Sequence, residues 1–190
     1  MNLQQEFGNI DIYLFDQLLR NRIPPGMTIF DAGCGGGRNL VYFLRNGYEV
    51  YAIDQHPQSI PNLPPANFRA EAIESTTLPE AIADIAIASA VLHFARSDDH
   101  FQAMLTAIWK RLKPKGLLFA RLASSIGIET QIQKLNGRRH LLPDGSERYL
   151  VDEQYLLDLT HSLNGTLEDP IKTTVVQNQR AMTTWVLKSQ

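Results

Sequence analysis

Short apolar runs alternate with longer segments of helical spacing along most of the chain. Runs of strand length and composition occur at MTIFDAG, YEVYAID, NFRAEAI and LLFARLA. A further run, ADIAIASAVLHF at residues 83–94, is apolar almost throughout, which is typical of a strand buried on both faces of a parallel sheet. The pattern therefore predicts five strands before residue 124.

Helical spacing of apolar residues separates these runs. It occurs at residues 9–23, which end before Pro24, at 38–46, which end before Gly47, and at 98–112. The segment HPQSIPNLPPAN carries four prolines, so a short helix or an irregular loop is expected there. Residues 151–163 predict one more helix, with Asp152 as its N-cap.

The runs KTTVVQ and MTTWVLK close the chain without a helix between them, so they are expected to pair in the antiparallel sense. The predicted fold class is α/β: a doubly wound, mostly parallel seven-stranded sheet with an antiparallel C-terminal strand. We expect one domain over residues 1–190. Residues 1–25 form an N-terminal helix that either packs on the sheet or acts as a lid, and residues 124–148 form an insertion near the substrate side.

Composition narrows the range of partners. The 190 residues are 44% hydrophobic and 20% charged, and 18 basic against 20 acidic side chains give a net charge of −2. No nucleic-acid partner is expected, because the basic GRRH segment is short and the chain is nearly neutral. The longest apolar run is too short for a membrane span, and the N-terminus has no signal-peptide pattern. With Cys34 as the single cysteine, a cytoplasmic protein without disulfides is expected.

The segment IFDAGCGGGRNL, residues 29–40, follows the first predicted strand. Glycines in that place allow tight turns and the close approach of a ligand to the backbone. A dinucleotide loop needs G-x-G-x-x-G, but Arg38 or Leu40 stands at the sixth position, and no Gly-Lys-Ser/Thr follows as in a P-loop. The pattern that fits is acid-x-Gly-x-Gly-x-Gly, formed by Asp31, Gly33, Gly35 and Gly37.

This pattern resembles the first motif of the class I S-adenosylmethionine-dependent methyltransferases, and the resemblance covers roughly residues 27–123. It implies S-adenosyl-L-methionine as the cofactor, with Asp54 at the end of the second strand on the ribose hydroxyls. It also implies Glu71 and Ala72 beside the adenine, and Ser89 to Phe94 beside the methionine part and the methyl group. The run through Gly-Arg-Asn is also similar to the tellurite-resistance and small-thiol methyltransferase branch.

Several single residues have two interpretations each. Asp31 either orders the loop or holds the methionine amino group, and Cys34 fits as a small residue better than as a nucleophile. His93 is the candidate catalytic residue, as a general base or a substrate contact, although a packed histidine also fits there. Phe94 and Arg121 are candidate substrate contacts. The basic group Arg138, Arg139, His140 and Arg148 fits a solvated insertion as well as an anion site.

The methyl acceptor is the least determined part. Enzymes that methylate amino nitrogens of nucleobases typically carry Asn/Asp-Pro-Pro-aromatic after the fourth strand, where this chain has SAVLHF. Together with the charge, this favours a small-molecule acceptor. No metal is expected, because no ligand-type residues cluster at a suitable spacing. The alternatives are a nicotinamide-dependent oxidoreductase and a protein that binds S-adenosylmethionine without catalysis.

Overall fold

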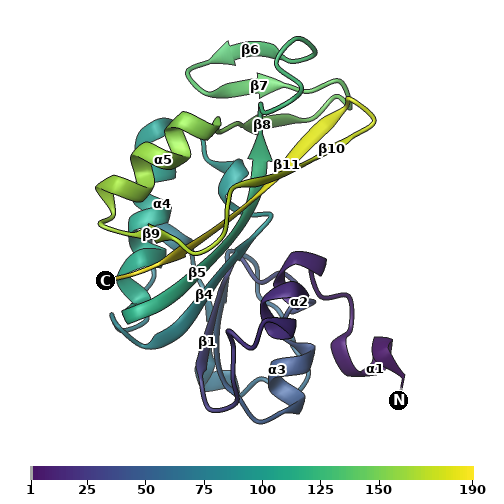
Figure 1. The fold of residues 1–190 in the computed structure, drawn as a ribbon. Helices are drawn as coiled ribbons and strands as arrows, with labels where there is room; N and C mark the ends of the chain where they lie inside the picture. The colour runs from purple at the N-terminus through teal and green to yellow at the C-terminus, as the bar shows by residue number, and fades with distance from the viewer. Residues whose placement is uncertain (1) are drawn as a thin grey trace.

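A computed structural model describes residues 2–190 and contains one large sheet with helices on both faces (Figure 1). The sheet has eight strands, in the order β10-β11-β5-β4-β1-β2-β3, and β9 also pairs with β11. β1 to β5 run parallel to one another, while β11 runs antiparallel to β5, β9 and β10. The strands are β1 (Thr28–Ala32), β2 (Glu49–Asp54), β3 (Phe68–Ala70), β4 (Ala83–Ser89), β5 (Leu112–Ser124), β9 (Thr166–Leu167), β10 (Lys172–Val176) and β11 (Arg180–Lys188).

Five α-helices flank this sheet. In Figure 1, α4 and α5 lie on one face, and α2 and α3 lie on the other. The helices are α1 (Leu3–Phe7), α2 (Ile12–Leu19), α3 (Val41–Arg45), α4 (Asp98–Arg111) and α5 (Glu153–Ser162), and there are 3₁₀ turns η1 (Pro65–Asn67), η2 (Ile73–Ser75) and η3 (Leu92–Phe94). Asp152 caps α5 through a bond from the Tyr155 N–H, as the sequence predicts.

Side chains of the central strands alternate between two cores, as the twofold period of a strand requires. On β4, Ala86 and Ala88 pack with α4 and α5, whereas Ile85 and Ile87 pack with α2 and α3. The small alanines face the longer helices, and the larger isoleucines fill the space over the shorter ones. The continuous apolar character of this run thus follows from burial on both faces, as predicted.

A second, smaller sheet occupies the polar segment after β5. Its strands β6 (Gln133–Asn136), β7 (Arg139–Leu141) and β8 (Glu147–Tyr149) pair antiparallel in the order β6-β7-β8. It lies beyond the end of β5 (Figure 1), and a bridge between Ser124 and Val151 joins its base to the main sheet. The segment expected to be an insertion, residues 124–148, thus contains most of a folded antiparallel sheet.

Two of the predicted elements are longer than the observed ones. The run at residues 83–94 is a strand only to Ser89, because Ala90 adopts φ +62° and the chain then turns into η3. Residues 38–46 contribute a helix only from Val41, because turns from Cys34 to Gly37 and from Gly37 to Leu40 precede it. The sheet also has an eighth strand, the two-residue β9, beyond the seven predicted.

The N-terminal helices pack beside the sheet. The ring of Phe7 stacks on Tyr42 of α3, with centroids 4.9 Å apart, and contacts Phe15 of α2 edge-on at 4.8 Å. The Tyr13 hydroxyl forms a hydrogen bond with Thr174 of β10 at 2.6 Å. The lid role of this segment stays a prediction. Within residues 2–190, none of the helices combines the length and apolar character that crossing a bilayer requires.

A polar cluster ties α2 to the segment before β10. The buried carboxylate of Asp169 accepts hydrogen bonds from Gln17 at 3.0 Å and from Arg22 at 2.7 Å. Burial alone would raise the pKa of Asp169, but the bonds from Arg22 and Gln17 outweigh it and lower the pKa. The cluster therefore stabilises the fold while Asp169 is ionised.

We expect Asp169→Ala to lower the free energy of unfolding by about 1–3 kcal/mol, because Gln17 and Arg22 lose their shared acceptor. The matched control is the neighbouring Glu168→Ala, whose ion pair with Arg22 is longer, at 3.4 Å, and more exposed; it should cost under about 1 kcal/mol. Urea unfolding at pH 7 measures both. The difference should shrink as the pH falls below the ordinary aspartate value, because the lowered pKa of Asp169 keeps it ionised until then. Equal effects of the two substitutions at pH 7 would contradict this assignment.

Candidate functional site

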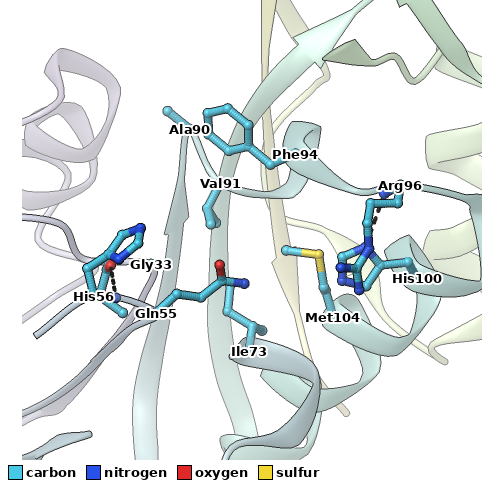
Figure 2. Close-up of a pocket in the computed structure, with 11 residues that line it drawn as sticks. Gly33, Gln55, His56, Ile73, Ala90, Val91, Phe94, Arg96, His100 and Met104 are labelled. Carbon is cyan, nitrogen blue, oxygen red and sulfur yellow. Dashed lines mark hydrogen bonds between the residues drawn. The ribbon is translucent and has the colours of Figure 1, made fainter. Parts of the chain in front are cut away.

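A cavity of about 440 Å³ opens at the carboxyl ends of β1, β2 and β4 (Figure 2). The strand order reverses between β1 and β4, which is where open α/β sheets leave a crevice. Gly33 after β1, Asp54 at the end of β2 and Ala90 after β4 all line it. We call it the glycine-loop cavity. Of the predicted cofactor residues, the structure brings Gly33 and Asp54 together here.

The glycines of the loop serve different purposes. Gly33, Gly35 and Gly37 all have positive φ values, of 75°, 51° and 75°. A Cβ on Gly33 would lie 2.4 Å from Val91, and one on Gly37 would lie 2.7 Å from Ile60, so both positions also give space to a packed side chain. At Gly35, nothing lies within 4 Å of such an atom. The loop thus needs glycine for its backbone at all three positions and for packing at two.

The carboxylate of Asp54 holds the glycine loop in place. Its Oδ2 accepts from the Gly35 N–H at 2.9 Å, and its Oδ1 accepts from the His56 N–H at 3.0 Å. Each oxygen keeps a further acceptor site, since a carboxylate oxygen can accept more than one bond. Asp54 therefore orders the loop and still presents acceptor positions to the cavity.

Asp31 is buried at the end of β1, 1% exposed. Its Oδ2 has no hydrogen-bond partner within residues 2–190. Burial raises the pKa of Asp31 to about 7, the positive charge of Arg38 opposes this rise, and the negative charge of Asp54 adds to it. An unpartnered buried carboxylate is costly unless a cation or a donor completes it. Asp31 is thus suited to interact with a positively charged ligand.

The wall across from the loop comes from η2 and α4. Ile73 and Met104 supply apolar surface, and His100 and Arg96 lie at the rim (Figure 2). The Arg96 N–H donates to His100 Nδ1 at 3.0 Å, so Nε2 of His100 bears hydrogen and donates to Glu74 at 3.0 Å. This wall is therefore fixed by its own hydrogen bonds.

Glu71 and Ala72 do not line the cavity. The Glu71 carboxylate accepts from Thr76 at 2.6 Å and from Thr77 at 2.8 and 3.0 Å. These bonds lower the pKa of Glu71 against the opposing effect of burial. The side chain that this segment contributes to the cavity is Ile73, immediately after Ala72. The assignment of Glu71 and Ala72 to the adenine stays a prediction.

Asp11, at the N-cap of α2, joins four segments and was not predicted. Its side chain is fully buried, and Oδ2 accepts from Arg121 at 2.9 Å and from Ser89 at 3.3 Å. Arg38 donates to the same Ser89 hydroxyl at 2.9 Å and lies 3.7 Å from Asp11. The predicted residues Ser89 and Arg121 are therefore brought together, by a carboxylate that precedes the glycine loop in the chain.

A second cavity, of about 290 Å³, lies on the other side of Ala90, which lines both. Its wall includes Arg121 of β5, Arg148 of β8 and Arg180 of β11, so we call it the arginine cavity. Phe94 is 57% exposed and lines the glycine-loop cavity, with the Arg148 guanidinium 5.0 Å from its ring centre. The candidate substrate contacts Phe94 and Arg121 thus lie on different cavities.

His93 faces the arginine cavity from η3 and is 7% exposed. Its Nδ1 accepts from the Ala123 N–H at 3.2 Å. Burial, and secondarily the charge of Arg148, lowers the pKa of His93 to about 4. Because a backbone N–H can only donate, the neutral ring carries its hydrogen on Nε2. In this arrangement His93 offers a donor, whereas a general base would need a free nitrogen lone pair.

Cys34 is not an activated nucleophile. Burial, together with the charges of Asp31 and Asp54, raises the pKa of the Cys34 thiol, which keeps it protonated. Between residues 2 and 190, no three or more His, Cys, Asp or Glu side chains are grouped to hold a metal ion.

Some cavity residues have a signal in the sequence and others have none. Met104 falls on the apolar face of a predicted helix, and Gln55 directly follows the acid of the second strand. Asp11 is one of many polar residues near the N-terminus, and only the tertiary structure places it against Arg121.

Comparisons with known proteins are consistent with this geometry. Residues 30–120 match the family described as "Methyltransferase domain". A protein from Synechocystis sp., named as an uncharacterized methyltransferase, is 28% identical over 99 residues, which are 50% of this chain and 46% of the relative. The chain thus spans about half the length of that curated relative.

Solved structures of similar fold include two methyltransferases with bound S-adenosylhomocysteine. The 1,6-didemethyltoxoflavin-N1-methyltransferase of Burkholderia thailandensis, also with bound 1,6-didemethyltoxoflavin, gives a TM-score of 0.70 at 20% identity over 100% of this chain and 81% of that one. The magnesium protoporphyrin IX methyltransferase of Synechocystis gives 0.69 at 15% identity over 94% and 81%. Residues 30–120 therefore match a methyltransferase-domain family model, and the fold of the chain is similar to that of these solved methyltransferases.

Proposed function

We propose that the protein transfers a methyl group from S-adenosyl-L-methionine to a small-molecule acceptor. The observation that carries this proposal is the pair of carboxylates beside the glycine loop: Asp54 lines the cavity, and Asp31 is buried with no partner for Oδ2 among residues 2–190. The first suits neutral hydroxyl donors, and the second suits a cation. A cofactor in which a ribose joins adenine to a positively charged methionine part needs both.

The residues present fit this cofactor without a further ligand. Asp54 would hold the ribose hydroxyls, Gly33 and Gly35 would admit it to the backbone, and Asp31 would face its positive charge. Ile73 and Met104 would cover its base. When bound, S-adenosylmethionine supplies a methyl group on a positively charged sulfur, so the donor needs no further activation.

The chain's own contribution is alignment. Ala90 lies between the two cavities, so an acceptor in the arginine cavity approaches the cofactor past a side chain of one carbon. Fixing two reactants in line can contribute about 7–11 kcal/mol to catalysis. His93 would position the acceptor by donating from Nε2. Neither cavity requires a metal or a nucleophilic side chain.

The two alternatives differ in what they predict. A nicotinamide-dependent oxidoreductase is not supported, because the loop lacks the third glycine of the dinucleotide pattern. A protein that binds S-adenosylmethionine without catalysis shares the cofactor site. Incubation with methyl-labelled cofactor and a panel of small acceptors separates it from our proposal, since label is transferred only by an enzyme.

Asp54→Ala should weaken the binding of S-adenosylhomocysteine about 10- to 100-fold, because charge-assisted hydrogen bonds to the ribose and to the loop are lost. Glu49→Gln, at the opposite end of β2 and exposed, is the control and should bind like the parent. Isothermal titration calorimetry measures both. Parent-like affinity in Asp54→Ala would exclude the ribose assignment.

Cofactor binding should release protons near neutral pH. Because Asp31 has a pKa of about 7 before the cofactor binds, with Arg38 already nearby, the further positive charge of the cofactor lowers that pKa and expels the proton. Affinity for S-adenosylmethionine should therefore rise as the pH increases from 6 to 8, and calorimetry in buffers of different ionisation enthalpy should show proton release at pH 7.

Asp31→Asn should lose this proton release. The variant distinguishes the contribution of Asp31 from any contribution of His56 and His100, which line the cavity. Equal proton release in the parent and in Asp31→Asn would refute the role of Asp31.

The His93 ring should stay neutral, with hydrogen on Nε2, from pH 8 down to about pH 5. Long-range ¹H–¹⁵N NMR of the imidazoles reports both the tautomer and the titration, and His93→Gln assigns the resonance. A midpoint near 6.5, the ordinary histidine value, or hydrogen on Nδ1 would contradict the donor role and restore the general base.

A further inference from the structure

The lining of the arginine cavity favours one chemical class of ligand, and the proposed function does not specify that class. Its inner end is Ala90 and His93, beside the glycine-loop cavity. Its outer end combines two elements far apart in sequence, because Arg148 comes from the small sheet and Arg180 from the first residue of β11. The insertion and the C-terminal hairpin thus meet on one cavity.

The two outer arginines are free of ion pairs. Arg148 donates to the Glu147 carbonyl at 2.7 Å and lies over Phe94, and neither it nor Arg180 has a carboxylate within 4.0 Å in the described part of the chain. By contrast, Arg121 is paired with Asp11 at 2.9 Å. Guanidinium groups without a partner are available for a ligand, and their planar fork suits carboxylates and phosphates.

The balance of charge separates these two ligand classes. Arg121 is already paired with Asp11, so the unpaired charges on the cavity are the guanidinium groups of Arg148 and Arg180 and the carboxylate of Asp144, which leave one positive charge over. Asp144 stays ionised, because bonds from Ser146 lower its pKa. One excess charge matches a monoanionic carboxylate better than a doubly charged phosphate.

The rest of the cavity is apolar and small. Leu142 and Met182 line it and pack with Ala123 in a separate cluster under the small sheet. A volume of about 290 Å³ is at the lower limit of ordinary ligand sites. The lining therefore suits a compact organic molecule with one charged end.

We propose that the methyl acceptor is a small monocarboxylate whose carboxylate is bound by Arg148 and Arg180, and whose nucleophilic atom lies toward Ala90 and His93. That the bound molecule accepts a methyl group rests on the proposed function. The carboxylate site itself has a readout that does not require methyl transfer.

The test compares benzoate with benzamide, which have the same shape but differ in charge. Ligand-observed saturation-transfer NMR measures both, with and without saturating S-adenosylhomocysteine. Benzoate should bind at least about tenfold more tightly than benzamide, because charge-assisted bonds replace neutral ones. The double substitution Arg148→Gln with Arg180→Gln should reduce this preference to near one.

Arg139→Gln is the matched control. It lies in the same small sheet, but its guanidinium pairs with Glu147 at 2.6 Å and does not line the arginine cavity. It should keep the full preference for benzoate. Thermal unfolding of all three proteins shows whether a loss reflects the site or the fold, and the single variant Arg180→Gln, on an exposed residue, should keep the parent's stability and lose part of the preference.

The outcomes distinguish the two proposals. Equal binding of benzoate and benzamide to the parent overturns the carboxylate site, and so does a preference that survives in the double variant. If S-adenosylhomocysteine fails to bind while the arginine-dependent preference remains, the proposed function fails and the carboxylate site stands. If both hold, methyl transfer to a carboxylate-bearing acceptor should fall in the double variant through KM more than through kcat.

Discussion

The reversal of strand order between β1 and β4 is the constraint on which the site depends. Chain segments leaving these two neighbouring strands diverge, one into the glycine loop and α3, the other into η3 and α4. Nothing of the sheet itself covers the gap between them. Gly33 and Ala90, the residues that follow the two strands closely, both have positive φ values, so each chain turns away sharply at its strand end. The glycine-loop cavity is the space that these turns leave.

This geometry explains the uneven success of reasoning from sequence. The strands of the main sheet could largely be identified because burial on both faces makes β4 apolar throughout, and because the acid-glycine pattern marks one loop in the chain. The end of β4 was not accessible, because Ala90 is an ordinary residue by composition. Its left-handed conformation costs roughly 1–2 kcal/mol for a residue with a Cβ, and only tertiary contacts, such as its N–H bond to Arg121 at 2.7 Å, can offset that.

The same distinction applies to side chains. Asp54 was implied by the family resemblance, which places an acid at the end of the second strand, and it lines the cavity. Glu71 has the equivalent place by resemblance, yet Thr76 and Thr77 of the following turn take up its carboxylate. The Asp11 network was beyond prediction, since it depends on where α2 packs. Breaking such a buried charge pair typically costs about 3–5 kcal/mol, so the network is a structural requirement as well as a boundary of the site.

The small sheet of β6, β7 and β8 is joined to the large sheet through one bridge, between Ser124 and Val151, and through an apolar cluster in which its Leu142 and Leu150 pack with Ala123 of β5. In the chain, the small sheet follows β5 and precedes α5. The bridge between Ser124 and Val151 holds these two connections together, so the chain enters and leaves the small sheet at nearly one place. Because β6 is exposed along its whole length and lies far in sequence from β1 and β2, the outer part of this unit can change without disturbing the strands that carry the glycine loop. Changes of acceptor preference can therefore accumulate in residues 125–150 while the donor side of the fold is kept, which makes this segment the natural starting point for redesigning the protein toward other molecules.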